Sequence, residues 1–247
     1  MNFEFEKEVL DKYIIKYYRC HDCLSLQTEY PYWLEEAYLR VKETGGLDVG
    51  SLHRTLNNFV RVYFICKFLR LNNVLDIGGG DGLLCRFLRD YGINCFSNDK
   101  YVNPRYSFGF TTPTFTSPDV VLCFEVMEHF DDPKTELELL FSKSPKLIIA
   151  STQLYNGQSS EWRYLGETHV FFYSKKALIS IATHYNYNLS IYGDQLIFYK
   201  RNIAFYFAGL LALIHNLLLF RVFKALAINA KPRGCDRDYA TLLGNQK

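Results

Sequence analysis

The chain has 247 residues, of which 28 are basic and 26 are acidic, giving a formal net charge of +2. This length suits one large globular domain with appendages, and the balanced charge argues against a nucleic-acid-binding tract, so no nucleic-acid partner is expected. The seven cysteines are an odd number spread through apolar stretches, and the N-terminus lacks the apolar segment of a signal peptide, which together favour a cytoplasmic protein with reduced thiols.

The first 70 residues are expected to form a helical cap. Residues 51–71 have the apolar spacing of a long amphipathic helix. The preceding PYWLEEAY segment offers Tyr32, Trp33 and Tyr38 as side chains that line an acceptor pocket or pack in the core.

Cys20 and Cys23 form a C-x-x-C pair within this cap, which is half of the four-cysteine pattern of a structural zinc site. No cysteine precedes them, so a zinc ion would need His21, the distant Cys235 or another subunit as a further ligand. The alternative is a turn that packs without metal.

The sequence NNVLDIGGGDGLLCRFLRDYG, residues 72–92, predicts a short buried strand, a glycine turn and an amphipathic helix. The glycines let backbone amides approach a ligand closely at the helix N-terminus. The spacing G-x-G-x-G differs from the G-x-G-x-x-G of dinucleotide-binding turns, and two acidic side chains here would suit a cationic ligand better than a pyrophosphate. The expected cofactor contacts in this segment are Asp76, Gly78, Gly79, Gly80, Asp81 and Gly82.

Residues 93–101 predict a second strand that ends at Asp99, where an acidic side chain binds ribose hydroxyls in nucleotide-binding βαβ units. Together, LDIGGGDG and Asp99 resemble the first two motifs of class I S-adenosylmethionine-dependent methyltransferases. The resemblance implies S-adenosyl-L-methionine as the cofactor, with Asp99 and Lys100 among its contacts.

The elements that follow fit the same order. Buried strands are predicted for VVLCF and KLIIAS. Helices are predicted for residues 133–141 and for the segment that follows Ser174, and a hairpin turn is predicted at Gly193-Asp194. The resemblance spans residues 72–201 and implies an α/β fold with a Rossmann-like seven-stranded sheet that ends in an antiparallel hairpin. We expect three parts, namely the N-terminal cap of residues 1–70, a catalytic domain of residues 71–201 and an apolar appendage of residues 202–247.

The EVMEH segment follows VVLCF, at the carboxyl end of a central strand where open α/β sheets bind ligands. In a helical turn, Glu125, Glu128 and His129 would share one face. Three interpretations stay open: a polar rim, a cofactor contact by Glu125 with an acceptor contact by His129, or a divalent-cation site. The last interpretation follows from a resemblance of E-x-x-E-H to ubiquinone-pathway O-methyltransferases. We expect the cofactor contact by Glu125 and do not favour a bound zinc or magnesium ion.

A second histidine lies in residues 159–178, which resemble the region of sugar methyltransferases where a histidine precedes an aromatic-Ser segment. The resemblance implies that His169, followed by FFYS, removes a proton from the acceptor, with His129 as the second candidate. Glu167 would orient the ring or raise its basicity. The alternative is an ordinary loop histidine between core aromatic residues.

Trp162, Tyr164 and Tyr173 would suit a sugar face or a packed lid. The resemblance implies methyl transfer to a small molecule, most simply a sugar in nucleotide-linked or lipid-linked glycan biosynthesis. The alternatives are O-methylation of a lipophilic molecule such as a quinone precursor, and a catalytically silent scaffold that binds the cofactor.

Residues 203–220 carry no formal charge and are flanked by basic residues. This pattern predicts an apolar helix or helical hairpin. Over residues 203–228 it would contact a membrane surface or a partner helix, or fold back on the catalytic domain.

Overall fold

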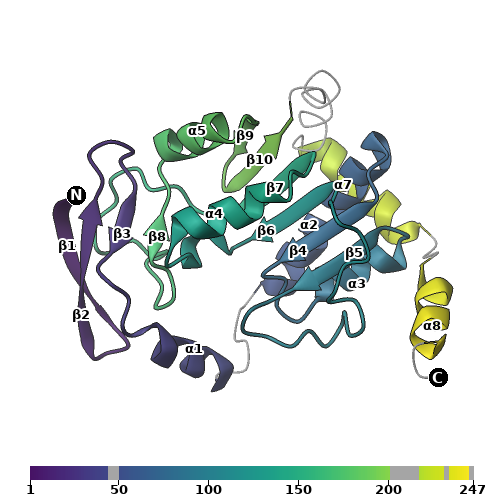
Figure 1. Cartoon of the computed structure of the whole chain (residues 1–247), viewed down its shortest axis with the longest axis horizontal. Coiled ribbons are helices and arrows are strands. Elements are labelled where there is room, and N and C mark those ends of the chain that lie inside the picture. Colours follow the sequence, from purple (N-terminus) through teal and green to yellow (C-terminus); the bar gives the residue numbers. More distant parts are fainter. Residues whose placement is uncertain (44–49, 201–216, 231–233, 245–247) are drawn as a thin grey trace. The chain divides into compact units, whose positions relative to one another are not determined.

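A computed structural model describes residues 1–43, 50–200, 217–230 and 234–244. Figure 1 shows the arrangement of its helices and strands. In chain order the elements are β1 (Asn2–Val9), β2 (Tyr13–Arg19), β3 (Leu26–Thr28), α1 (Leu34–Glu43), α2 (Ser51–Leu69), β4 (Asn73–Ile77), α3 (Leu83–Asp90), β5 (Asn94–Asn98), β6 (Val120–Phe124), the 3-10 helix η1 (Met127–His129), α4 (Pro133–Ser142), β7 (Leu147–Ser151), β8 (Phe171–Phe172), α5 (Lys175–His184), β9 (Asn188–Tyr192), β10 (Gln195–Tyr199), α7 (Leu217–Asn229) and α8 (Cys235–Gly244).

The strands form two sheets, with the orders β1-β2-β3-β8 and β5-β4-β6-β7-β10-β9. In the larger sheet, β4 pairs in parallel with β5 and with β6, so Asp76 lies opposite both Ser97 and Leu122. Only two residues join β9 to β10, and such a short connection requires antiparallel neighbours. The sheet is therefore mixed. The described residues give it six strands, so the expected count of seven is not confirmed.

The predicted elements of the α/β region agree closely with the structure. The strand and helix expected within residues 72–92 are β4 and α3, and VVLCF and KLIIAS form β6 and β7. Ser174 caps α5, because its hydroxyl accepts a hydrogen bond from the Ala177 amide at 3.0 Å. Local patterns fixed these elements, since each depends on residues close together in the chain.

The helical cap expected over the first 70 residues is wrong for its first part. Residues 2–28 form the three strands β1, β2 and β3, and only α1 and α2 are helical. The strand NFEFEKEV alternates apolar and acidic residues with a period of two, which predicts a strand rather than a helix. In β2 the same alternation buries Ile15 and Tyr17.

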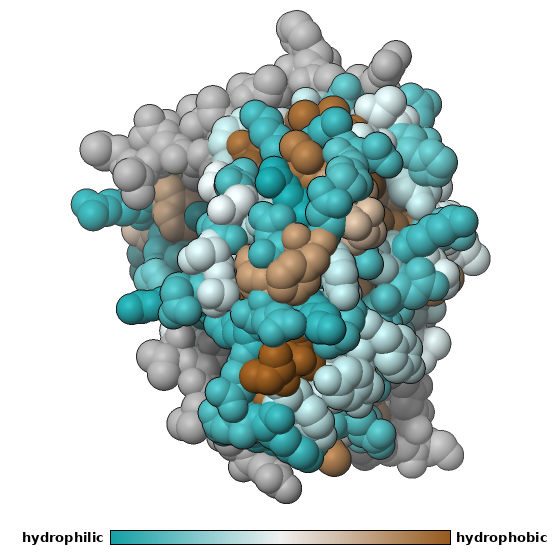
Figure 2. Space-filling model, turned by 90° about the vertical axis from the view of Figure 1, so that its left-hand side faces the viewer, coloured by the Kyte–Doolittle hydropathy of each residue, from teal (hydrophilic) through white to brown (hydrophobic). Residues whose placement is uncertain are grey.

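Figure 2 shows the side of the molecule that carries these N-terminal strands. Apolar side chains appear there as small groups separated by hydrophilic ones. Phe3 and Ile14 are each 56% exposed on this sheet. Isolated exposed apolar residues of this kind are normal for a protein surface.

The chain divides into two compact units. The first comprises Met1–Val49, Glu125–Phe141 and Ala150–Phe198, and the second comprises Gly50–Phe124, Ser142–Ile149 and Tyr199–Lys247. The core of the first unit joins the small sheet to α1 and to the segment before β8, through Val9, Ile15, Tyr17, Leu26, Trp33, Ala37, Tyr155, Tyr164, Leu165, Val170 and Phe172.

In the second unit, aromatic rings of α2 pack on α3 and on α7. The Phe59 ring lies 5.4 Å from that of Phe87 on α3, and the Phe64 ring lies 4.6 Å from that of Phe223 on α7. Helix α7 is therefore packed on α2. Residues 203–216, most of the predicted apolar run, lie outside the described residues, and no described helix has the length and apolarity needed to cross a membrane.

Candidate active site

The glycine turn between β4 and α3 is held by Asp99, which follows β5. One carboxylate oxygen of Asp99, Oδ2, accepts a hydrogen bond from the Gly80 amide at 3.0 Å. The other, Oδ1, accepts from the amides of Tyr101 and Val102, both at 2.8 Å. Asp99 therefore ties the turn to the loop that leaves β5. Lys100 is exposed, with its Nζ 5.3 Å from the centroid of the Tyr101 ring.

Gly79 lies so close to its neighbours that no side chain fits there. A Cβ atom at this position would come within 2.3 Å of Ser97 Oγ and 2.6 Å of Asp76 Oδ2. Gly78, Gly80 and Gly82 have positive φ angles, as a turn of this shape requires. Gly80 differs from Gly79 because a Cβ there would meet no atom within 4 Å, so the turn is open on that side.

Asp76 is 2% exposed, at the fourth residue of β4. Burial, with a smaller contribution from the charge of Asp99, raises the pKa of Asp76 to about 7. Its Oδ2 atom has no hydrogen-bond partner among the described residues. Asp81, by contrast, is exposed, and its backbone carbonyl accepts a hydrogen bond from the Tyr106 amide at 2.9 Å.

In the first unit, Glu125 and Glu128 lie on either side of the start of η1. Glu125 has a φ angle of +54°, which is rare for a residue with a side chain and typical of positions with a functional constraint. Its Oε1 accepts a hydrogen bond from the Ser151 hydroxyl at 2.6 Å. Glu128 is completely buried, and its backbone carbonyl accepts a hydrogen bond from the Val170 amide at 2.8 Å.

The Tyr164 hydroxyl joins these two carboxyl groups. It donates a hydrogen bond to Glu128 Oε1 at 2.6 Å and lies 3.4 Å from Glu125 Oε2 and 3.2 Å from Thr152 Oγ1. Burial, followed by the charge of Glu125, raises the pKa of Glu128 to about 8. Burial and the two carboxylates also raise the pKa of Tyr164, so its hydroxyl remains a donor.

His129 and His169 lie side by side, with ring centroids 4.8 Å apart. The Nδ1 atom of His169 is 2.6 Å from the carbonyl oxygen of Tyr164, and that of His129 is 2.9 Å from the carbonyl oxygen of Thr168. Since a carbonyl only accepts, both Nδ1 atoms carry a proton. Burial and the neighbouring His129 lower the pKa of His169 to about 4, so its Nε2 is unprotonated at neutral pH.

The His169 ring is oriented by a backbone group rather than by Glu167. The Glu167 carboxylate instead accepts a hydrogen bond from Arg40 at 3.0 Å, and its backbone carbonyl accepts one from the Trp33 indole at 2.9 Å. Trp33 is a core residue, whereas Tyr38 lies beside His129 with ring centroids 6.3 Å apart.

The other aromatic residues expected from the sequence to contact the acceptor differ in how exposed they are. Tyr32 is 54% exposed, and Tyr173 is fully buried. Trp162 packs beside Tyr164, with ring centroids 5.4 Å apart. Among the described residues, no group of three potential metal ligands includes Cys20 or Cys23.

Tyr164 and Glu128 have a larger part in the hydrogen bonds of this cluster than the sequence indicated. Tyr164 was expected as a sugar face or lid, and Glu128 was considered as a ligand only in the divalent-cation interpretation of EVMEH. The spacing E-x-x-E was a signal for Glu128, because it places the second carboxyl group one turn after the first. No local signal identifies Tyr164, which comes 36 residues after Glu128.

Glu128, His129 and His169 offer ligand atoms that all lie within 4.8 Å of one another. Two features fit a metal ion. Both histidines donate Nδ1 protons to backbone carbonyls, an arrangement typical of metal-binding imidazoles, and the buried Oε2 of Glu128 has no hydrogen-bond partner among the described residues.

A glycine turn closed by an acidic residue after the next strand, on an α/β sheet of mixed direction, is the arrangement expected of S-adenosylmethionine-dependent methyltransferases. The profile of the methyltransferase domain family matches residues 51–190, more than half of the chain, and the chain belongs to that family. S-adenosyl-L-methionine is the cofactor of this class. No curated protein matches the chain.

Two solved structures illustrate the likeness in fold. The 1,6-didemethyltoxoflavin-N1-methyltransferase of Burkholderia thailandensis is 12% identical, with a TM-score of 0.50, over 78% of this chain and 96% of that chain. The magnesium protoporphyrin IX methyltransferase of Synechocystis PCC 6803, with bound S-adenosylhomocysteine, is 13% identical, with a TM-score of 0.46, over 69% of this chain and 97% of that chain. At such identities, the first likeness indicates a shared fold and nothing about the acceptor.

Proposed function

We propose that this enzyme transfers the methyl group of S-adenosylmethionine to a hydroxyl group of a sugar. The observation that carries the proposal is a cluster of three side chains. The buried Tyr164 hydroxyl donates to the buried Glu128 carboxyl group, and the Tyr164 carbonyl accepts from the partly buried imidazole of His169. Buried polar groups are costly in a core unless they have a function or complete partners. In this proposal residues 71–201 form the catalytic domain.

The cofactor-binding part of the proposal rests on the second unit. Its proposed contacts are Asp76, the glycines of the turn, Asp81, Asp99 and Lys100. The open side of Gly80 would receive the ligand, while Asp99 would bind a ribose hydroxyl with the lone pair of Oδ2 that its amide contacts leave unused. The acidic side chains of the turn suit the positive charge of the sulfonium.

The acceptor-binding part assigns the proton chemistry to His169. Its Nδ1 proton is held by the carbonyl of Tyr164, so Nε2 has a free lone pair that points away from this bond. The sulfonium already activates the methyl group, so alignment of the acceptor oxygen supplies much of the rate. Removal of the hydroxyl proton by Nε2 would contribute about 10²-fold more, the lower end of the usual range, because the lowered pKa makes the His169 imidazole a weak base. His129 is the second candidate for this role.

The sugar acceptor is supported by the side chains around this cluster. Aromatic faces and carboxyl groups are what a sugar needs, because the former pack on its apolar face and the latter bind its hydroxyls. Trp162 is partly exposed beside Tyr164, and Tyr38 is partly exposed beside His129. A phenolic acceptor such as a quinone precursor would use the same aromatic faces, so it is the alternative that the test must separate.

The test has two stages. Calorimetry should show S-adenosylmethionine binding by the wild type and at least tenfold weaker binding by Asp99→Ala; a wild type that does not bind would overturn the cofactor assignment.

The second stage measures transfer of a radioactive methyl group to nucleotide sugars and to catechol-type phenols. His169→Ala should lose at least 100-fold in rate at unchanged cofactor affinity. His184→Ala, an exposed histidine at the end of α5, is the matched control and should behave as wild type.

A second candidate mechanism uses a divalent cation held by Glu128, His129 and His169. Their ligand atoms lie within 4.8 Å of one another, and carboxyl oxygens and imidazole nitrogens both bind divalent cations. A bound cation would act as a Lewis acid that lowers the pKa of the acceptor hydroxyl. Incubation with a chelator separates the two ideas. Full activity after chelation, with no thermal shift on adding Mn²⁺, Mg²⁺ or Zn²⁺, supports His169 as the base. Lost activity restored by one of these ions, and abolished binding of that ion in Glu128→Gln, supports the cation.

A further inference from the structure

The C-terminal helix α8 is fixed to the second unit through one buried carboxylate. Asp238 is 2% exposed, and its oxygens accept hydrogen bonds from Arg89 Nε and Nη2, both at 2.7 Å, and from Arg86 Nη2 at 2.6 Å. Both arginines belong to α3, the helix that begins at the glycine turn. Although burial alone would raise it, these hydrogen bonds hold the pKa of Asp238 below its usual value.

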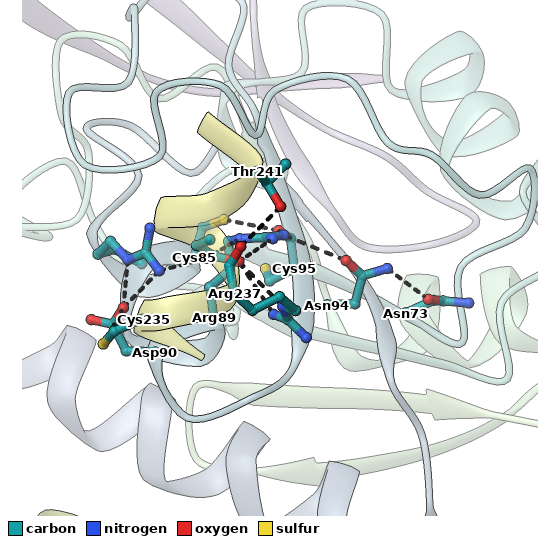
Figure 3. A network of polar contacts seen from close by, with 11 residues as sticks. Asn73, Cys85, Arg89, Asp90, Asn94, Cys95, Cys235, Arg237 and Thr241 are labelled. Atoms are coloured by element: carbon teal, nitrogen blue, oxygen red, sulfur yellow. Dashed lines mark hydrogen bonds and ion pairs between the residues drawn. The ribbon is translucent and has the colours of Figure 1, made fainter. Parts of the chain in front are cut away.

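Arg89 links this carboxylate to the rest of the cofactor-binding region. Its Nη1 donates to the backbone carbonyl of Cys95 in β5 at 2.7 Å, and its guanidinium lies 3.5 Å from the centroid of the Phe110 ring. Figure 3 shows Arg89 beside Asn94 and Cys95, next to the ribbon of α8. Because a bidentate arginine pair has a fixed geometry, the position of α8 is transmitted to β5 and to Phe110.

Close backbone contact fixes the start of α8 as well. The Gly234 amide donates to the Asp90 carbonyl at 2.7 Å, and a Cβ at Gly234 would lie 1.7 Å from the carbonyl oxygen of Arg89. Only glycine fits there. The helix is thus attached at Gly234, just before its first residue, and at Asp238. Both attachments are made to α3, within the second unit.

The loop of residues 104–110 lies between α8 and the glycine turn. At one end, a Cβ at Gly109 would lie 2.5 Å from Leu242 Cδ2 of α8. At the other end, a Cβ at Gly82 would lie 2.2 Å from Ser107 Oγ, and the Tyr106 amide donates to the carbonyl of Asp81 at 2.9 Å. The chain of contacts therefore runs from α8 through this loop to the turn.

We propose that α8 is a clamp on the cofactor site, in which Asp238 and Leu242 hold the loop of residues 104–110 against the glycine turn. The proposal rests on the proposed cofactor site at that turn. Asp238 and Leu242 are positioning residues, since they act through the loop and do not touch the ligand. Loosening the clamp lets the loop leave the turn, which weakens cofactor binding and leaves the chemical step intact.

The test uses the full chain and two variants of different severity. Leu242→Ala shortens the partly buried side chain that faces Gly109 and should fold normally, and Asp238→Asn removes the charge that pairs with Arg89. Both should raise the Kd and KM for S-adenosylmethionine, by about three- to tenfold for Leu242→Ala and by about tenfold or more for Asp238→Asn. The kcat at saturating cofactor should change less than twofold. Asp238→Glu, which restores the carboxylate, should recover at least part of the affinity.

Tyr239→Ala is the matched control, because Tyr239 is 67% exposed on the same helix. It should bind S-adenosylmethionine as the wild type does. If Leu242→Ala and Asp238→Asn lower only the melting temperature and bind the cofactor with wild-type affinity, the clamp is wrong and α8 serves stability alone. A wild type that fails to bind S-adenosylmethionine would instead overturn the proposed cofactor site, so the two failures are distinguishable.

Discussion

Glu128 is the residue whose environment most needs a functional reason. Its side chain is fully buried, one oxygen accepts a 2.6 Å hydrogen bond from Tyr164, and the other has no partner among the described residues. Replacing the group by an apolar side chain of similar volume would cost little or even stabilise a core without a function. Its presence is consistent with an acceptor or a cation that uses the second oxygen.

The Tyr164–Glu128 hydrogen bond can be tested by removing only the hydroxyl. Tyr164→Phe keeps the aromatic packing but leaves a buried carboxyl group without its donor, so the free energy of unfolding should fall by about 1 to 3 kcal/mol. Chemical denaturation measures this loss. Tyr155→Phe is the control, because its hydroxyl donates to the partly exposed Glu4, which water can solvate instead, so the loss should stay below about 1 kcal/mol. Equal losses in the two variants would contradict the assigned environment of Glu128.

Asp76 makes stability depend on pH. Its pKa is raised from 3.8 to about 7, so between these values the folded chain keeps a proton that the unfolded chain releases. The free energy of unfolding must therefore fall as the pH rises from about 4 to about 7. Asp76→Asn should remove this fall, which amounts to up to about 4 kcal/mol.

Denaturation of wild type and Asp76→Asn between pH 4 and pH 8 gives the two slopes. The slope is the readout, since the amide alters packing equally at every pH. Asp81→Asn is the control in the same turn, because Asp81 is exposed and should leave the pH slope as in the wild type. Parallel curves for wild type and Asp76→Asn would mean that Asp76 is charged in the folded protein at neutral pH.

At the scale of elements, the β4–α3 turn owes its shape to contacts that exclude side chains. Gly79→Ala would push a methyl group against Ser97 Oγ and Asp76 Oδ2, with a cost of about 1 to 3 kcal/mol in unfolding free energy and at least a tenfold loss of S-adenosylmethionine affinity. Gly92→Ala is the control at the other end of α3. It has a φ of +83° but meets no atom within 4 Å, so it should cost about 1 to 2 kcal/mol and leave the affinity unchanged. Equal affinities of the two variants would argue that the cofactor does not use this turn.

The elements of the α/β region were predictable because each is encoded locally. The helix expected within residues 72–92 is α3, Leu83–Asp90, and the run VVLCF is β6. The N-terminal strands were not predicted, because NFEFEKEV has a period of two but too few apolar residues to mark a buried face clearly. In the structure, β1 pairs with β2 in antiparallel register, and Lys7 lies opposite Ile15.

At the scale of the whole molecule, part of the C-terminal segment belongs to the second unit. Phe223 of α7 packs beside Phe64 and Phe68 of α2, and Lys224 donates to Asn57 at 3.1 Å. Phe223→Ala should therefore lower the free energy of unfolding in water by about 1 to 2 kcal/mol. Leu226→Ala, 57% exposed on the same helix, is the control and should change it by less than about 0.5 kcal/mol. Unchanged stability of Phe223→Ala would favour the predicted contact with a membrane surface or a partner helix.

The sequence by itself determined the class of this protein, because strand, glycine turn, helix and strand-terminal Asp99 are neighbours in the chain and specify a cofactor site locally. It also indicated His129 and His169 as candidate bases, a role that stays a prediction. Only the tertiary structure decided which groups meet: Tyr164 reaches Glu128 across 36 positions, and Arg89 reaches Asp238 across 149. Such partners lie on different elements, and their pairing depends on how those elements pack. Burial, which sets the pKa of Asp76, Glu128 and His169, is likewise a property of the folded chain.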